Sequence, residues 1–69
     1  MTLDDFTFKF GMGFAGTTYY AYYQKELICR VNPPASEDQS KLLITLIIKQ
    51  RYNFTIDKDQ IDFKWNGTI

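Results

Sequence analysis

Hydrophobic and polar residues alternate strictly near the start of the chain. Phe6, Phe8, Phe10, Met12 and Phe14 occupy the even positions, and polar residues or glycines occupy the odd positions between them. Side chains at every second position of a strand point to the same face of its sheet. The pattern therefore predicts a half-buried strand over residues 6–14 that has one aromatic face.

A second strand-like run extends from Tyr19 to about Val31 and is rich in tyrosine and β-branched residues, which favour strands. Residues 15–18 predict the turn between the two runs, because Gly16 can adopt a positive φ. Pro33 and Pro34 end the second run, since proline cannot donate a hydrogen bond to a sheet ladder.

The two runs stay in phase when the chain folds back about Gly16 and Thr17. The apolar residues that then face each other are Phe14 and Tyr19, Met12 and Ala21, and Phe10 and Tyr23. On the opposite side each tyrosine ring covers a glycine, with Tyr20 opposite Gly13 and Tyr22 opposite Gly11. Lys25 would fall on the apolar side, so we expect a bulge or a break near Gln24 and Lys25.

The middle of the chain has the sequence features of a helix. Ser36 can cap its start, and Gln39, three residues later, completes a capping box. The basic residues Lys49 and Arg51 suit the negative end of the helix dipole. Apolar residues follow helical spacing between these ends, at Leu42, Leu43, Leu46 and Ile47. The sequence therefore predicts a helix from about Ser36 to Tyr52, ending at Asn53.

The same segment has an alternative interpretation as a strand. Leu42, Ile44, Leu46 and Ile48 also alternate, and isoleucine favours strands. Periodicity does not decide between the two interpretations. The caps and the order of the charges favour the helix, and a strand over residues 42–52 stays as the alternative.

The end of the chain returns to alternation. A loop over residues 54–60 precedes Ile61, Phe63 and Trp65, which predict a last strand that Asn66 and Gly67 close as a turn. A right-handed crossover through the helix places this strand parallel to the second, in the order second–first–third. We therefore expect a single α+β domain over residues 1–69, with the order β-β-α-β and a three-stranded, mostly antiparallel sheet that has one helix packed on one face.

Charge and chemistry exclude several classes of function. Eight basic and eight acidic residues give zero net charge, which weakens the electrostatic case for nucleic acid or an anionic membrane as a partner. We expect no signal peptide, no membrane span and a cytoplasmic location, since the apolar run over residues 42–48 is far shorter than the roughly 20 residues of a span. The single cysteine, Cys29, excludes an intrachain disulfide and resembles a small buried hydrophobe.

Histidine is absent, so histidine-based catalysis and histidine-ligated metal sites are excluded. Residues 11–16 match the dinucleotide-binding pattern G-x-G-x-x-G, but they lie within a predicted strand and turn instead of opening a helix. The carboxylates of Asp57, Asp59 and Asp62 lack the glycine and the closing glutamate of a calcium loop. We therefore expect no enzyme, no cofactor and no metal.

One helix covers only one face of a sheet, and the other face must meet solvent or a partner. The residues predicted for this uncovered face include Lys9, Tyr20, Tyr22, Ile28 and Arg30, with Thr7, Gln24, Glu26, Asp62 and Lys64 around them. Tyrosine and arginine are enriched at interface hot spots, whereas the competing explanation is that the two tyrosines only cover Gly11 and Gly13.

The leading hypothesis is a non-catalytic protein-binding module that inhibits or regulates a larger macromolecule by occupying its surface. A phage-type inhibitor of a host defence system is one example of such a chain. The alternative is a single-stranded nucleic-acid-binding protein that stacks bases on the tyrosines of the same face. An unpaired edge strand would also allow a homo-oligomer.

Overall fold

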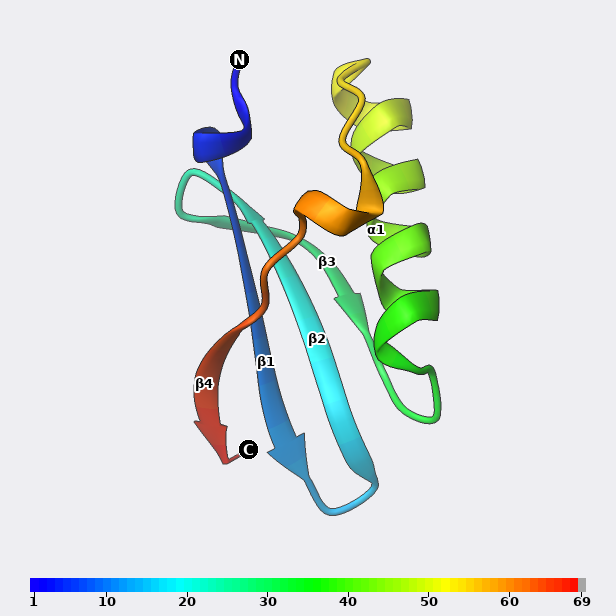
Figure 1. Ribbon diagram of the computed structural model, residues 1–69. Coiled ribbons are helices and arrows are strands. Elements are labelled where there is room, and N and C mark those ends of the chain that lie inside the picture. The colour runs from blue at the N-terminus through cyan, green and yellow to red at the C-terminus, as the bar shows by residue number, and fades with distance from the viewer. Residues whose placement is uncertain (69) are drawn as a thin grey trace.

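The computed structural model describes residues 1–68 as one sheet with one long helix beside it (Figure 1). Its elements are η1 (Leu3–Asp5), β1 (Phe6–Gly13), β2 (Gly16–Tyr23), β3 (Glu26–Val31), α1 (Glu37–Tyr52), η2 (Lys58–Gln60) and β4 (Lys64–Thr68). The sheet order is β3-β2-β1-β4, in which only the β1–β4 pair is parallel. The predicted α+β class is confirmed, with four strands in place of three.

The fourth strand arises because the predicted second strand is two strands. The chain reverses at Gln24 and Lys25, where a bulge or a break was expected. Gln24 adopts a left-handed conformation with φ 56°, and its N–H donates a hydrogen bond to the Asp5 carbonyl at 2.7 Å. This turn makes β3 a separate edge strand. The last strand, β4, lies beside β1 as predicted, but it runs parallel to β1, whereas a strand parallel to the predicted second strand would run antiparallel to β1. The predicted direction holds only relative to β3, the part of that second run that leads into the helix.

The predicted register between the first two strands is wrong by four residues. Phe10 pairs with Tyr19 and Phe6 pairs with Tyr23, because the chain turns at Phe14 and Ala15, between the paired residues Gly13 and Gly16. A shift of four residues is even, so every side chain within β1 and β2 keeps its predicted face. Phe14, predicted as part of the first strand, lies in the turn instead.

In the observed register, the two tyrosines of the open side do not lie opposite the glycines that they were predicted to cover. Tyr20 lies opposite Lys9, and Tyr22 lies opposite Thr7. Gly11 instead pairs with Thr18. The explanation that the tyrosines are placed only to cover the glycines directly across the ladder is therefore wrong.

The helix begins and ends where its capping residues predict. The Gln39 N–H donates to Ser36 Oγ at 3.1 Å, and the Ser36 N–H donates to Gln39 Oε1 at 3.0 Å, which completes the capping box. Asn53 ends the helix in the left-handed conformation, with φ 53°. The alternative of a strand over residues 42–52 is therefore excluded.

The core lies between α1 and the sheet. Ser40, Ile44 and Ile48 of the helix are fully buried. They face a layer of sheet residues made of Phe6, Phe8, Tyr19, Ala21, Cys29 and Val31. Cys29 is buried as expected, and burial raises the pKa of its thiol. Among residues 1–68, no helix combines the length and the apolarity that crossing a bilayer requires.

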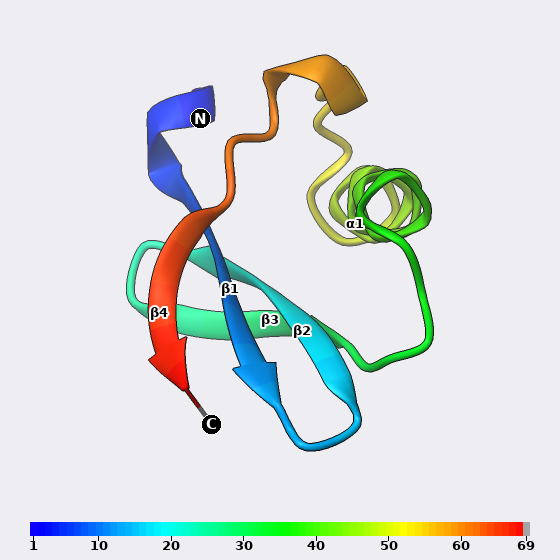
Figure 2. The same cartoon turned by 60° about the horizontal axis from the view of Figure 1, so that its bottom comes forward.

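The helix runs along the β2–β3 side of the sheet and not over its middle (Figure 2). The segment between α1 and β4 covers part of the remaining face, where Ile56 and Ile61 are buried. The predicted last strand is therefore displaced, because Ile61 belongs to this covering segment and β4 begins at Lys64. Asn66 and Gly67 lie within β4, so the turn predicted there is wrong.

Candidate functional site

One row of side chains crosses all four strands on the sheet face turned away from α1. In sheet order the row consists of Arg30, Tyr20, Lys9 and Lys64, which are direct neighbours in the ladders. Since neighbouring strands lie about 4.8 Å apart, the row spans about 14 Å. Together with Thr7, Tyr22 and Leu27, these residues form a surface that we call the open face.

Two tyrosines and a lysine are packed together at the centre of the open face. The ring centres of Tyr20 and Tyr22 lie 6.4 Å apart, and the planes meet at 31°. The ammonium group of Lys9 lies 5.3 Å from the centre of the Tyr22 ring, within the range of a cation–π contact. All three side chains are partly buried. They therefore form an ordered aromatic and cationic platform on the sheet.

Ile28 does not belong to the open face, contrary to the prediction. A register shift in β3 sets Leu27 opposite Tyr22 and Glu26 opposite Tyr23, while Cys29 still pairs with Ala21. Ile28 is the extra residue of this bulge, and it packs against the hydrophobic core. Leu27 takes its place beside Tyr22 and is 47% exposed. Strict alternation cannot predict such a change, because a bulge adds one residue to one strand only.

The structure therefore brings together four of the five residues predicted for this surface, namely Lys9, Tyr20, Tyr22 and Arg30. Lys64 adds a third cation to the row, but its Nζ lies 2.7 Å from Asp62 Oδ2. This hydrogen bond and the charge of Lys64 hold the pKa of the Asp62 carboxyl below its ordinary value. The open face is thus cationic on a chain whose net charge is zero.

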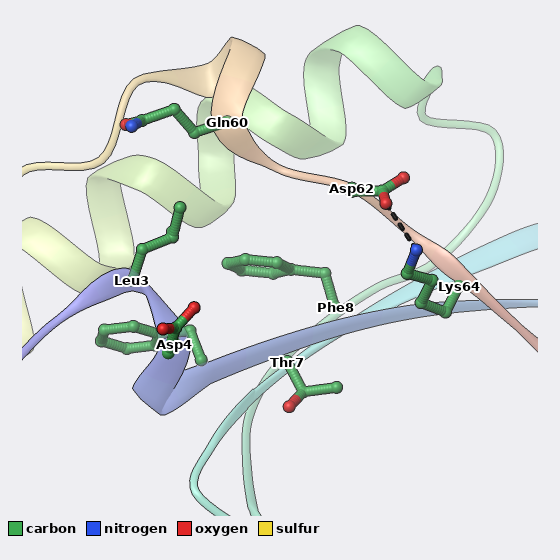
Figure 3. Close-up of a pocket in the computed structure, with 8 residues that line it drawn as sticks. Leu3, Asp4, Thr7, Phe8, Gln60, Asp62 and Lys64 are labelled. Carbon is green, nitrogen blue, oxygen red and sulfur yellow. Dashed lines mark ion pairs between the residues drawn. The ribbon is translucent and has the colours of Figure 1, made fainter.

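A shallow hollow of about 270 Å³ adjoins the open face (Figure 3). It lies where η1, β1 and the segment before β4 meet. Leu3, Phe6 and Phe8 give it an apolar part, and the Asp62–Lys64 ion pair stands on one side of it. Thr7 and Lys64 line both the hollow and the open face, so the two surfaces are continuous. The hollow is of a size to receive a side chain of a partner bound to the open face.

A second set of exposed apolar residues lies in β1, in the β1–β2 turn and in β4, and the alternating pattern did not predict its exposure. Met12, Phe14 and Trp65 were all expected to face the helix. Phe14 is instead fully exposed in the turn, Trp65 is 57% exposed and Met12 is 44% exposed. Trp65 packs against Phe10, with ring centres 5.2 Å apart. We call Met12, Phe14 and Trp65 the hairpin end.

The exposure of the hairpin end follows from the width of a helix compared with the width of the sheet. A helix is about 10 Å wide, and strands are about 4.8 Å apart, so one helix covers about two strands. In a sheet of more than two strands, some aromatic residues on the helix side must therefore lie beyond the helix. Here α1 lies against β2 and β3, which leaves Met12 of β1 and Trp65 of β4 uncovered.

Two further sequence patterns, the glycine motif and the acidic residues, take other roles in the described part of the chain than their letters suggest. Gly11 and Gly13 lie in β1 and Gly16 begins β2, so the G-x-G-x-x-G letters form a hairpin and not the start of a helix. Within residues 1–68, no three acidic or cysteine side chains gather in a way that could hold a metal ion. Comparison with known proteins assigns no family to the chain, since no protein-family model, no curated protein and no solved structure matches it.

Proposed function

We propose that this chain is a non-catalytic protein-binding module whose open face occupies the surface of a larger protein partner. One observation carries the proposal: Tyr20 lies between Lys9 and Arg30 and packs beside Tyr22, on a sheet face that no helix or strand of residues 1–68 covers. Aromatic residues and arginine are the types enriched at the centres of protein interfaces.

The order already present in the open face supports this role. Binding costs free energy whenever side chains that rotate freely must be fixed in one conformation. Tyr20, Tyr22 and Lys9 contact one another on a rigid sheet before any partner arrives. Less conformational entropy is therefore lost on binding than for three isolated surface side chains.

The charge of the open face indicates the chemistry of the partner. Lys9 and Arg30 flank Tyr20 in the row, and Asp62 at the margin is paired with Lys64. The complementary surface on the partner would carry carboxylates around an apolar centre. Occupying such a surface is how small inhibitors and regulators act, phage-type inhibitors of host defence systems among them.

The experiment begins with the capture of a partner from the native host and its identification by mass spectrometry. Isothermal titration calorimetry then compares the wild-type chain with the double variant Tyr20→Ala, Tyr22→Ala and with Arg30→Ala. We expect the double variant to weaken binding at least about tenfold, as hot-spot residues do. Lys25→Ala, which removes a charge from the exposed turn between β2 and β3, serves as the matched control for Arg30→Ala and should leave the affinity unchanged.

Folding is monitored in every variant by far-ultraviolet circular dichroism. A partner that binds the folded double variant as tightly as the wild-type chain would show that the open face is not the binding surface.

A second candidate function, binding of single-stranded nucleic acid, is favoured by the same tyrosines next to three cations. Three cations can neutralise at most three phosphates, so log K would fall against log salt with a slope no steeper than about −2. Titration of oligothymidylate at several salt concentrations tests this candidate. Tyrosine-dependent binding with that slope would favour nucleic acid, whereas absent binding would leave the protein partner as the sole candidate.

A further inference from the structure

The outer side of α1 carries an apolar stripe that nothing in the described part of the chain, residues 1–68, covers. Leu42, Leu43 and Leu46 are 47%, 44% and 61% exposed. The side of a surface helix that faces solvent is usually polar, and adjacent exposed apolar residues commonly mark an interaction site. Three neighbouring leucines on a single helix of 16 residues therefore require an explanation.

The stripe lies between two opposite charges on the same side of the helix. At about 100° per residue, Asp38, Leu42, Leu46 and Lys49 fall within an arc of about 80°. The buried residues Ser40, Ile44 and Ile48 lie on the opposite side of the helix. Asp38 precedes the leucines and Lys49 follows them, so an acidic end, an apolar middle and a basic end succeed one another along the exposed side.

This arrangement is complementary to a copy of itself that runs in the opposite direction. Along the helix axis, the midpoint between Leu42 and Leu46 lies at Ile44. The midpoint between Asp38 and Lys49 lies about half a residue, or about 0.8 Å, from the same point. A two-fold axis at that level brings Leu42 against the partner's Leu46 and Asp38 towards the partner's Lys49. The dipoles of the two helices then oppose each other, which is also favourable.

We infer that two copies of this chain associate through their α1 helices, packed antiparallel around a two-fold axis near Ile44. Each surface patch meets the same patch of the other copy, as in an isologous dimer. The leucines supply the apolar contact, and the two Asp38–Lys49 pairs select the antiparallel orientation. Asp38 also holds Lys58 at 2.8 Å, which ties the acidic end of the patch to η2.

The dimer and the proposed binding function use different surfaces. The leucine stripe lies on the side of α1 opposite to its buried residues, and the open face is the side of the sheet turned away from α1. Figures 1 and 2 show that α1 stands on one side of the sheet. Both open faces therefore remain accessible in the dimer. Two linked open faces would bind a partner with repeated sites more tightly than one open face does.

Sedimentation equilibrium of the full chain tests the inference over about 1 µM to about 1 mM, because a contact through one helix is small and its dimer weak. We expect the average mass to rise with concentration from 8.1 kDa towards twice that value. A chain that stays monomeric over the whole range overturns the inference.

The variant Leu46→Glu places a charge at the most exposed position of the stripe and should raise the dissociation constant of the dimer at least about tenfold. Leu27→Glu makes the same change on the open face and should leave the dissociation constant of the dimer unchanged. A dimer that is unaffected by Leu46→Glu, or that is lost in Leu27→Glu, lies elsewhere and contradicts the inference.

Charge reversal gives a second test that does not depend on the leucines. Asp38→Lys and Lys49→Asp should each weaken the dimer, and the double variant should restore part of the lost affinity, since the ion pair between Asp38 and Lys58 is still missing in it. Failure of the double variant to recover, with circular dichroism showing an intact helix, would overturn the antiparallel arrangement. These results are separate from those of the proposed function, because none of the four dimer residues lies on the open face.

Discussion

The ammonium group of Lys9 lies 5.3 Å from the centre of the Tyr22 ring, so a cation and an aromatic ring are already paired on the open face. Lys9 is also the direct neighbour of Tyr20 in the ladder between β1 and β2. One lysine thus links both tyrosines to the cationic row. The pairing makes this lysine part of the platform instead of a freely moving surface charge.

The first prediction concerns this lysine. Lys9→Met keeps most of the apolar length of the side chain and removes its charge, so the free energy of unfolding should fall by no more than about 1 kcal/mol. Affinity for an acidic partner should fall more steeply at low salt than at high salt, because screening weakens the lost attraction. Urea unfolding measures the first effect, and calorimetric titration at two salt concentrations measures the second. Equal affinity losses at both salt concentrations would contradict an electrostatic role.

The second prediction concerns the tight turn of the hairpin. Gly16 has a φ of +130°, and a Cβ at this position would lie 3.2 Å from the Cβ of Pro33. Gly16→Ala should therefore lower the free energy of unfolding by about 1–3 kcal/mol, through backbone strain and crowding together. Urea denaturation provides the measurement, and Ala15→Ser in the exposed turn is the control, expected to be nearly neutral. An unchanged midpoint for Gly16→Ala would show that the turn adapts without cost.

The third prediction tests the start of the helix. Ser36→Ala removes the oxygen that accepts from the Gln39 N–H at 3.1 Å, and it should cost about 1 kcal/mol of stability. Ser36→Asp keeps an acceptor at the same place and should retain most of that stability. Chemical denaturation of the wild-type chain and the two variants measures both differences in the free energy of unfolding. Equal losses in both variants would mean that the cap contributes through packing and not through its hydrogen bond.

This helix was predictable from the sequence because its signals are local. Ser36, Gln39 and Asn53 act on backbone groups within four residues of themselves, so their identities alone set both ends of α1. The faces of β1 and β2 were predictable for a related reason, since alternation assigns each side chain to one side of the sheet. These two features were enough to obtain the fold class and to bring Lys9, Tyr20 and Tyr22 together. Arg30 of β3 lies opposite Tyr20 only because of the bulge at Ile28.

The register was not predictable from the same pattern. Phe10 opposite Tyr19 and Phe10 opposite Tyr23 satisfy the alternation equally well, because the two registers differ by an even number of residues. The choice between the two registers depends on the position of the turn. Its central residues, Phe14 and Ala15, are not glycine, asparagine or proline, the residue types that mark a turn in a sequence. The exchange of Ile28 for Leu27 and the exposed hairpin end likewise depend on the bulge in β3 and on where α1 lies, which are tertiary properties.

The fourth prediction concerns the ion pair beside the hollow. Lys64 hydrogen-bonds Asp62 and holds the pKa of that carboxyl below its ordinary value. A nuclear magnetic resonance titration should place the midpoint of Asp62 lower in the wild-type chain than in Lys64→Ala. Because the folded-state pKa is lowered, the pair stabilises the fold above the unfolded pKa, and this contribution disappears as the pH falls through the folded value.

Both side chains of this pair are largely exposed, so solvent screens their attraction and the pair adds little stability. The thermal midpoint of Lys64→Ala at neutral pH should accordingly stay close to that of the wild-type chain. An unchanged Asp62 midpoint in Lys64→Ala would show that the ion pair does not persist in solution.

The fifth prediction asks whether the hairpin end takes part in partner binding. Phe14 is fully exposed, so Phe14→Ser should change the free energy of unfolding by less than about 0.5 kcal/mol. Trp65 contacts Phe10, so Trp65→Ala should cost more stability, about 1 kcal/mol for the loss of the aromatic contact and its partial burial.

Calorimetric titration of the same two variants with the captured partner then separates two outcomes. Trp65 and Lys64 are adjacent in β4 and point to opposite sides of the sheet, so a partner that reaches around this edge strand would contact the open face and the hairpin end together. Weaker binding by Phe14→Ser, a variant of unchanged stability, would show this larger interface. Full affinity in both variants would confine binding to the open face, where Tyr20 and Tyr22 would have to supply the central contacts alone.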